Sequence, residues 1–504
     1  MIELRNNDTS VPLSSITPLD YTYFYELVIS LLSIEAKHCV SYFAHPEKDG
    51  WLCICCIADD ETEKIMVLAH KVKKTRSKTI PALSAKHPAL HSYEREMHEN
   101  YGIPFANHPW LKPLRFPQGA ADENSTIQRY PFYSLTGEGT HEVGVGPIHA
   151  GITEPGYFRF CCNGEKVLHL ESVLGFQHRG IEKLLLKKTH PLQQSVIAES
   201  IAGDTTIGHS LAYAMLAESL SDTKISARLS MERGMALEIE RVAMHIADTS
   251  AMCADTAYQL GQVACEALRT ITINTLQAWC GNRFGKGLIR PGGTYYTAYH
   301  ETLNQIATAL NDVKKRYRDI SDCIFTLPGM LSRFEGVGAL THKQALQLGM
   351  VGLTARASGV RRDIRSTHAF MSYKTHAFNP NIMENGDIHA RMMLRKIEVE
   401  QSIDLILSLA DKLAALSILT SESTPGYQLQ YQPESLAISL VEGWRGEICH
   451  MAVTNEKGEI SQYKIKDPSL HNWMGLSIAM RNQQISDFPI CNKSFNLSYC
   501  GHDL

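Results

Sequence analysis

The sequence predicts an α+β protein, in which a small mixed N-terminal domain precedes a larger, mainly helical domain with peripheral β hairpins. Three observations support this. The 504 residues suffice for two or more domains. Strand-like stretches dominate the first part, whereas long amphipathic helix patterns fill the second. A segment rich in Gly, Pro, Ser and charge lies between them. The expected boundaries are 1–112 for the first domain, 113–145 for a linker and 146–504 for the second domain.

The N-terminal domain begins with a helix-like run at 20–36, and three strand-like stretches follow it. The strands are expected at 38–44, 50–58 and 64–71. The domain ends in the run Ser92-Tyr-Glu-Arg-Glu-Met-His-Glu-Asn-Tyr-Gly102, which fits an amphipathic helix that stops at the glycine. This alternation of helix and strands predicts a small α+β unit.

The second domain is expected to open and to close with β hairpins. Strands at 156–162 and 165–170 flank Asn163-Gly164, a strong hairpin turn. Strands at 447–454 and 462–466 flank the turn that ends at Gly458. Helices are expected between the hairpins, at 181–188, 193–203, 209–220, 224–260, 261–279, 297–325, 341–349 and 389–416.

Composition excludes several classes of function. The 49 basic and 53 acidic residues give a net charge of −4, and no basic block indicates nucleic-acid binding. No apolar run reaches the roughly 18 residues that a membrane span needs, and the polar N-terminus lacks the apolar core of a signal peptide. We therefore expect any membrane association to come through partner subunits.

The 13 cysteines are scattered, and only Cys53 and Cys56 have C-x-x-C spacing, without the second pair of a zinc or cluster site. Cys53, Cys55 and Cys56 lie in one apolar run and read as core thiols of a reducing compartment. Cys491 and Cys500 lie close to the C-terminus, where a remnant metal site is the weaker alternative. No metal site is predicted on the chain.

Seven stretches, taken in order, carry a family resemblance: Ser92–Pro109, Gly146–Arg159, Leu174–Lys183, Leu237–His245, Arg290–Gly293, Ala355–Asp363 and Tyr463–Ser469. Together they resemble one superfamily, which unites the 30 kDa and 49 kDa subunits of respiratory complex I with the large subunits of energy-converting hydrogenases. The fused order, with the 30 kDa-like unit first, resembles the large subunits of formate hydrogenlyase and hydrogenase-4.

Two windows, 198–213 and 487–504, resemble the hydrogenase metal boxes, each of which carries a Cys-x-x-Cys pair in hydrogenases. The pair positions here are Ala202 and Thr205, then Ser498 and Gly501. These side chains cannot replace four thiolates. The resemblance therefore implies a hydrogenase-related large subunit without a nickel–iron centre, and no hydrogenase activity of its own.

Resemblance to complex I would imply a quinone-site histidine and tyrosine. Glu154-Pro155-Gly156 lies near the expected histidine, and the expected tyrosine falls at or beside Gly203. No tyrosine occurs between Phe160 and Ala212. The known quinone chemistry is therefore unsupported.

Four residues are candidates for a proton relay or for lining the pocket. His178 and Glu182 are spaced i, i+4 at an expected helix start, where they would share a face; a structural charge network is the equal alternative. For Asp204, capping of the following helix is the favoured alternative. His209 could lie on a proton path or simply pack in the core.

Arg290 and Arg356 are weaker candidates for binding an anionic group or a partner's carboxylates. Neither region matches a dinucleotide or phosphate loop. We therefore expect no NAD on this chain, although the assembly as a whole could use it.

The resemblance implies a large subunit of a membrane-bound, complex I-like oxidoreductase. It would dock a small subunit carrying 4Fe–4S clusters, act with ion-translocating membrane subunits, and lie peripherally on the cytoplasmic face of the membrane. It would couple electron transfer to ion translocation without a cofactor of its own. Two alternatives remain: a quinone-reducing NADH dehydrogenase-type subunit that uses other residues, and a non-catalytic coupling subunit.

Overall fold

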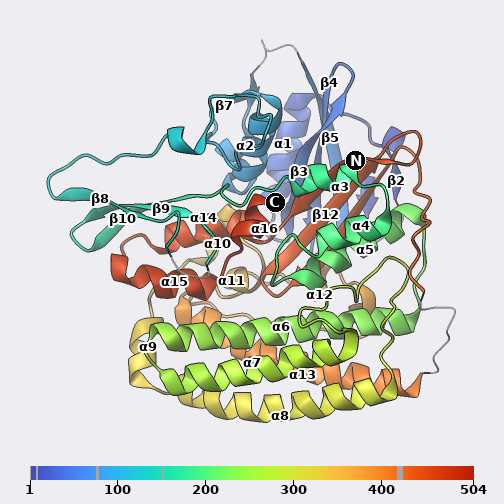
Figure 1. Ribbon diagram of the computed structural model, residues 1–504. Coiled ribbons are helices and arrows are strands. Elements are labelled where there is room, and N and C mark those ends of the chain that lie inside the picture. Colours follow the sequence, from blue (N-terminus) through green and yellow to red (C-terminus); the bar gives the residue numbers. More distant parts are fainter. Residues whose placement is uncertain (1, 7–9, 75–78, 150–152, 417–423) are drawn as a thin grey trace.

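The computed structural model describes residues 2–6, 10–74, 79–149, 153–416 and 424–504. Sheets and short helices form its upper part in Figure 1, and a layer of long helices lies beneath them. The expected α+β class is confirmed, because a mixed N-terminal unit precedes a mainly helical one.

The N-terminal unit is built on an antiparallel sheet whose strand order is β1-β5-β4-β3. On one face of β4, Cys53 and Cys55 pack against α1 and α2. On the other face, Ile54 and Cys56 enter the main core. Successive side chains of a strand point to opposite faces, so burial of both faces explains the continuous apolar run. The elements are β1 (Ile2–Leu4), α1 (Tyr21–Leu32), β3 (Lys37–Glu47), β4 (Gly50–Asp59), β5 (Lys64–Lys73) and α2 (His91–Tyr101).

A second sheet, in the order β13-β12-β11-β2, joins the two ends of the chain. The expected hairpin is present as β12 (Gly446–Thr454) and β13 (Ile460–Lys466). The sequence reading missed β11 (Ser435–Gly443), which pairs with β12 and with β2 (Val11–Pro12). Since β2 comes from the N-terminal part, the two units share this sheet as well as the main core.

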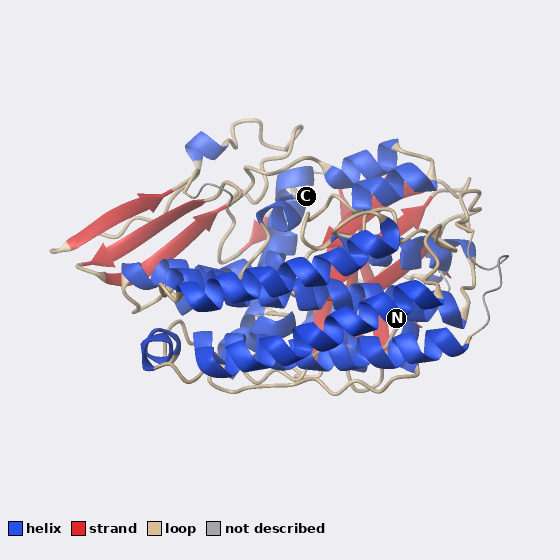
Figure 2. Ribbon diagram, turned by 60° about the horizontal axis from the view of Figure 1, so that its bottom comes forward, coloured by secondary structure: helices blue, strands red, loops and turns tan. Residues whose placement is uncertain are grey.

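A third sheet, in the order β10-β9-β8, projects from the body (Figure 2). It contains β8 (Thr140–Val145), β9 (Tyr157–Asn163) and β10 (Lys166–Val173), and β9 and β10 form the expected hairpin at Asn163-Gly164. The segment 113–145, expected as a linker, thus ends in a strand. Two short strands, β6 (Ile80–Pro81) and β7 (Phe105–Ala106), pair in parallel.

Four long helices form the lower layer: α6 (Ala227–Asp255), α7 (Gln259–Cys280), α8 (His300–Ile324) and α13 (Ile388–Ala415). Between this layer and the second sheet lies α5 (Thr206–Ser221), which is buried almost all round and mostly apolar, with His209 and Glu218 among its buried polar residues. No helix in the described part of the chain is long and apolar enough to cross a membrane. The remaining helices are α3 (Ile181–Lys187), α4 (Pro191–Ala198), α9 (Pro328–Phe334), α10 (His342–Leu348), α11 (Gly352–Arg356), α12 (Ile364–Thr367), α14 (Ser469–Ala479), α15 (Phe488–Phe495) and α16 (Tyr499–Asp503).

A buried ionic contact connects the first sheet to the second. Glu447 on β12 accepts a hydrogen bond from Lys466 on β13, and its Oε2 lies 2.7 Å from Nε2 of His38 on β3. Burial opposes ionisation, yet Lys466 holds the pKa of Glu447 well below its usual range. Burial also lowers the pKa of His38, so Lys466 supplies the compensating charge.

The Lys466→Met substitution should destabilise the full-length chain by about 3–5 kcal/mol, because it leaves the Glu447 carboxylate buried without a cation. Chemical denaturation measures this loss. Lys71→Met is the matched control: Lys71 pairs with Glu47 at the surface, so its loss should cost less than about 1 kcal/mol. Adding Glu447→Gln to Lys466→Met should restore part of the stability. Equal effects of the two lysine substitutions would contradict this account.

Candidate functional site

The structure brings the windows 198–213 and 487–504 together. The first window runs from the end of α4 through the following loop into the first half of α5, and the second ends in α16. The guanidinium of Arg179 donates to the backbone oxygens of Ser200 and Ile201, each at 2.7 Å, and to that of Cys500 at 3.1 Å. One side chain therefore holds both windows in place.

A second arginine, Arg445 in the β11–β12 turn, also joins the windows. Its two terminal nitrogens bind the Asp204 carboxylate at 2.7 and 2.6 Å, and its Nε donates to the Asn496 oxygen at 2.5 Å. The guanidinium lies 3.9 Å from the centre of the Trp444 ring. Burial opposes the charge, but Asp204 holds the pKa of Arg445 above its usual range.

The capping role considered for Asp204 is wrong. α5 begins at Thr206, and its N-cap is Thr205, which makes no capping hydrogen bond through its side chain. The Asp204 carboxylate instead accepts hydrogen bonds from the Thr205 hydroxyl and from Arg445. The side chain is 39% exposed, so this ion pair lies at the outer edge of the site.

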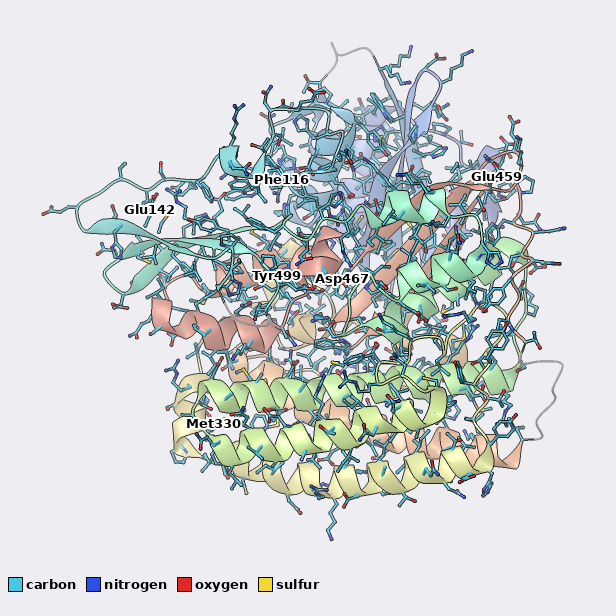
Figure 3. The ribbon with its side chains drawn as sticks, in the orientation of Figure 1. Phe116, Glu142, Met330, Glu459, Asp467 and Tyr499 are labelled. Carbon is cyan, nitrogen blue, oxygen red and sulfur yellow. The ribbon has the colours of Figure 1, made fainter. Side chains whose placement is uncertain are left out.

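Four buried protonatable side chains, one of them His209 of the first window, form a continuous hydrogen-bonded chain. Nε2 of His209 lies 3.1 Å from Oδ2 of Asp467, and its Nδ1 lies 3.1 Å from Nε2 of His450. The Tyr463 hydroxyl lies 2.8 Å from Nδ1 of His450. Each of the four is at most 1% exposed. Asp467 lies near the middle of the molecule, beside the C-terminal helix that carries Tyr499 (Figure 3).

The hydrogen bonds that join Tyr463, His450, His209 and Asp467 all run in one direction. The Asp467 carboxylate accepts from His209 Nε2, which places the proton of a neutral His209 on that nitrogen. Nδ1 of His209 must then accept from His450 Nε2, and Nδ1 of His450 must accept from the Tyr463 hydroxyl. Every proton thus points toward Asp467.

The electrostatic setting agrees with this pattern. Burial lowers the pKa of His450 far below its usual range, and nearby His209 lowers it further. Burial raises the pKa of Tyr463, so both groups are neutral near pH 7. Burial disfavours the charged form of Asp467, but the hydrogen bond from His209 and the charge of Arg445 lower its pKa. The row of hydrogen-bonded side chains therefore runs from the neutral Tyr463 phenol to the Asp467 carboxylate.

The residues at the four pair positions do not fit a nickel–iron centre. Ser498 caps α16, accepting a hydrogen bond from the Gly501 N–H at 2.9 Å. A Cβ built on Gly501 would lie 2.6 Å from the Asp467 carboxyl, so only glycine admits this carboxylate. Ala202 carries no donor, and the Thr205 hydroxyl bonds Asp204 and Arg445.

The nearby thiols do not supply the missing donors. Burial raises the pKa of Cys500 to about 12 and that of Cys491 to about 11. A neutral thiol is a weak ligand. Cys491 also lies against Arg391 instead of facing the windows. Among the described residues, no group of three or more His, Cys, Asp or Glu side chains is arranged to hold a metal ion.

His178 and Glu182 are placed differently from the helix-face expectation. His178 lies before α3, because Gly180 takes a left-handed conformation (φ 67°) and the helix starts at Ile181. Nδ1 of His178 donates to the Asp503 oxygen at 2.7 Å. Glu182 accepts from the Ile465 N–H at 2.9 Å. The two side chains nevertheless line one small cavity of about 40 Å³.

Arg290 and Arg356 bind carboxylates of this chain itself. Arg290 lies 2.5 Å from Glu199 and is 5% exposed. Arg356 is fully buried and contacts three acids, at 2.5 to 3.0 Å: Asp363, Glu398 and Glu442. Arg290 thus pairs with an acid of the first window, whereas the acids that bind Arg356 lie outside both windows. Of the six sequence candidates, only Asp204 and His209 lie on the elements that form the site between the windows.

Sequence reasoning missed three members of the site and one arginine at its edge. Tyr463 is the first residue of the motif Tyr463–Ser469, which carried the family resemblance, and Asp467 lies near its end. The sequence therefore contained a signal for both residues. His450 lies on the strand that was expected at 447–454. Because successive side chains of a strand point to opposite faces, His450 and Cys449 could have been assigned to opposite faces of the sheet. No sequence pattern pointed to Arg445 as a site residue, because β11 was not recognised and the β11–β12 turn could not be placed.

Comparison with known proteins agrees with the fold. The family model of the respiratory-chain NADH dehydrogenase 49 kDa subunit matches residues 261–503, and that of the 30 kDa subunit matches residues 4–131. Three relatives carry hydrogenase or hydrogenlyase names, and each matches most of this chain. Formate hydrogenlyase subunit 5 of Escherichia coli is 24% identical, over 83% of this chain and 76% of its own length. Hydrogenase-4 component G of Escherichia coli is 22% identical over 91% and 84%, and the carbon monoxide-induced hydrogenase of Rhodospirillum rubrum is 28% identical over 71% and 97%.

The chain is therefore similar both to these complex I subunits and to complex I-related hydrogenase subunits. It joins a 30 kDa-type unit to a 49 kDa-type unit in one polypeptide. This confirms the resemblance expected from the motifs.

Glu240 of α6 binds the first turn of α5, and from its pKa we expect the stability of the folded chain to depend on pH. Its carboxyl lies 2.7 and 3.1 Å from the N–H groups of Ile207 and Gly208. Burial raises its pKa from 4.5 to about 8. The folded state therefore binds this proton more tightly than the unfolded state, and stability falls as pH rises from about 4.5 to 8.

Replacing Glu240 with glutamine should remove this fall. The stability of Glu240→Gln relative to the unsubstituted chain should rise by a few kcal/mol between pH 5 and pH 8, because one pKa unit corresponds to about 1.4 kcal/mol. Denaturant titrations across this range measure the difference. Glu301→Gln, at an exposed position on α8, should run parallel to the unsubstituted chain. A Glu240→Gln curve that is also parallel would refute the assignment.

Proposed function

We propose that this chain is the large subunit of a membrane-bound oxidoreductase of the complex I and hydrogenase-4 kind. It couples electron transfer from an iron–sulfur partner to ion translocation without a nickel–iron centre. The partner carries the 4Fe–4S clusters, membrane subunits translocate the ion, and this chain lies peripherally on the cytoplasmic face. The observation that carries the proposal is the buried chain Tyr463–His450–His209–Asp467, which includes His209 of the first window.

The role of these residues is to move a proton. One proton enters at Tyr463 as the hydroxyl proton passes to His450 Nδ1. The proton on His450 Nε2 passes to His209 Nδ1, and the proton on His209 Nε2 passes to Asp467. Both histidines remain neutral, and Asp467 gains one proton. Electron arrival at a partner cluster near the windows would favour this movement, because the added negative charge attracts the proton.

The absence of a nickel–iron centre is supported by the donor set. The pair positions offer no thiolate, and the Arg445 guanidinium lies where it binds Asp204 and Thr205 of the first window. A cation in this position disfavours a dication beside it. The Asp467 carboxylate already accepts from His209 and from the Ser469 N–H.

One observation favours a second candidate, quinone reduction by residues other than those of complex I. The Tyr499 hydroxyl lies 3.3 Å from Nε2 of His149, in the loop that follows β8. Glu154 accepts from the Cys500 N–H at 2.9 Å beside this pair. A histidine and a tyrosine so placed could both donate to a quinone's oxygens.

The proposal is tested in inverted membrane vesicles that carry the complete native complex, with reduced viologen as donor and the vesicle quinone pool as acceptor. Tyr463→Phe removes only the hydroxyl at the entry of the proton chain, and His209→Gln removes its central group. Each should lower ion uptake at least tenfold while the complex still assembles, because a relay step typically contributes 10²–10⁴-fold. His300→Gln, at an exposed position on α8, should leave uptake unchanged.

The outcomes separate the candidates. Unchanged uptake in both relay variants would refute the proposed proton chain and favour a purely structural subunit. Loss of quinone reduction in Tyr499→Phe, with the relay variants active, would favour the second candidate. Failure of the native complex to build any ion gradient would refute coupling.

A further inference from the structure

A cavity outside the site described above lies at the seam between the two units. It is bounded by α2 of the N-terminal unit and by β10 and α14 of the second unit (Figure 1), and its volume is about 220 Å³. Its walls are mostly apolar and aromatic, and they include Trp110, Tyr130, Leu174, Trp473 and Met474. Pockets of this composition, with a few polar groups, are typical of small-molecule sites.

An arginine without an acidic partner lines this cavity. Arg95 of α2 is 8% exposed, and its Nε and Nη2 donate to the Lys112 and Pro113 oxygens at 2.7 and 2.5 Å. No ion pair joins Arg95 to any acid among the described residues, and Nη1 makes no hydrogen bond to any of them. A buried charge without a partner is costly, so its retention indicates a missing anion.

The two acids whose charges act on Arg95 are committed elsewhere. Glu99 accepts from the N–H groups of three successive residues of the following loop, at 2.9 to 3.1 Å, which are Leu114, Arg115 and Phe116. Glu171, which also lines the cavity, pairs with Lys112 and accepts from the Tyr133 N–H at 2.8 Å. Both carboxylates favour the charge of Arg95 from a distance, but neither forms an ion pair with it.

A second unpartnered polar group lines the same cavity. His91, one helical turn before Arg95, is 6% exposed, and its Nδ1 makes no hydrogen bond among the described residues. Its Nε2 lies 3.2 Å from the Ser92 hydroxyl. Burial, and then the charge of Arg95, lower the pKa of His91, so it remains a neutral donor or acceptor. Arg481, exposed on the cavity wall, adds a further positive charge.

We propose that this cavity is a binding site for a small apolar monocarboxylate. The carboxylate would lie on Nη1 of Arg95 with His91 as a second contact, and the apolar body would lie between Trp110 and Trp473. The volume is below the roughly 300–1,000 Å³ of pockets for drug-sized ligands, which limits the body to a single ring or a short alkyl chain. The proposal is independent of the proton chain, because the two sites share no residue.

Benzoate and hexanoate are the probes, titrated into the full-length chain, and tryptophan fluorescence is the readout because Trp110 and Trp473 line the cavity. Saturable binding of at least one probe is expected. Preference for benzoate would indicate an aromatic ligand, and preference for hexanoate an aliphatic one. Benzamide, which lacks the charge, should bind at least tenfold more weakly than benzoate.

Two variants test the site in different ways. Arg95→Met should weaken binding at least tenfold, but it also removes hydrogen bonds to the loop at Lys112. Met474→Trp fills the cavity and keeps Arg95, and it should abolish binding with the fold intact by circular dichroism. Arg316→Met, which removes an exposed cation on α8, should bind like the unsubstituted chain. No saturable binding of either probe, equal binding of benzamide, or unchanged binding in Met474→Trp would each overturn the proposal.

Discussion

The contact of Arg445 with Asp204 is the interaction on which the arrangement of the site depends. Arg445 is carried by the turn of the central hairpin, Asp204 by the first window, and the same guanidinium reaches Asn496 just before the C-terminal helix. Three segments far apart in sequence thus converge on one buried charge. A bidentate arginine–carboxylate pair fixes orientation as well as distance, so it sets where α5 and α16 face each other.

With the windows held in this way, Asp467 contacts His209 of the first window. Gly501 admits the carboxylate because it has no side chain, and the imidazole of α5 approaches from the other side. His450 and Tyr463 extend the contact along β12 and β13. The fold resembles that of redox-enzyme subunits, and the side chains at the centre of the site are of types that can carry protons. Function in such a frame must be argued from the residues of the site, because one fold supports several chemistries.

The sequence was informative where structure is local. The boundaries of α6 and of the Asn163-Gly164 hairpin follow from apolar periodicity and turn chemistry, and the structure places both within a few residues of the expectation. The strand β11 was missed, because its turn contains Trp444-Arg445 instead of a typical hairpin pair. The expected helix at 181–188 is present as α3, but His178 precedes it and so does not share a helix face with Glu182.

The centre of the site could not be predicted for a different reason. Asp204 has the local signature of a helix cap, but an arginine 241 positions later in the chain binds it instead. The partners of His209 are 241 and 258 residues away. Arg356 was a weaker candidate for binding an anionic group or a partner's carboxylates, but it binds the nearby Asp363 and the more distant Glu398 and Glu442 of the same chain. Such pairings depend on the tertiary fold, which sequence patterns alone do not specify.

The most direct test of the central claim is a single-particle density map of the native complex at a resolution that shows side chains. The account predicts density for the Arg445 guanidinium on Asp204 and for the Asp467 carboxylate on His209, with no metal-sized peak between Ala202 and Ser498. A metal peak there, with Arg445 turned away from Asp204, would contradict it.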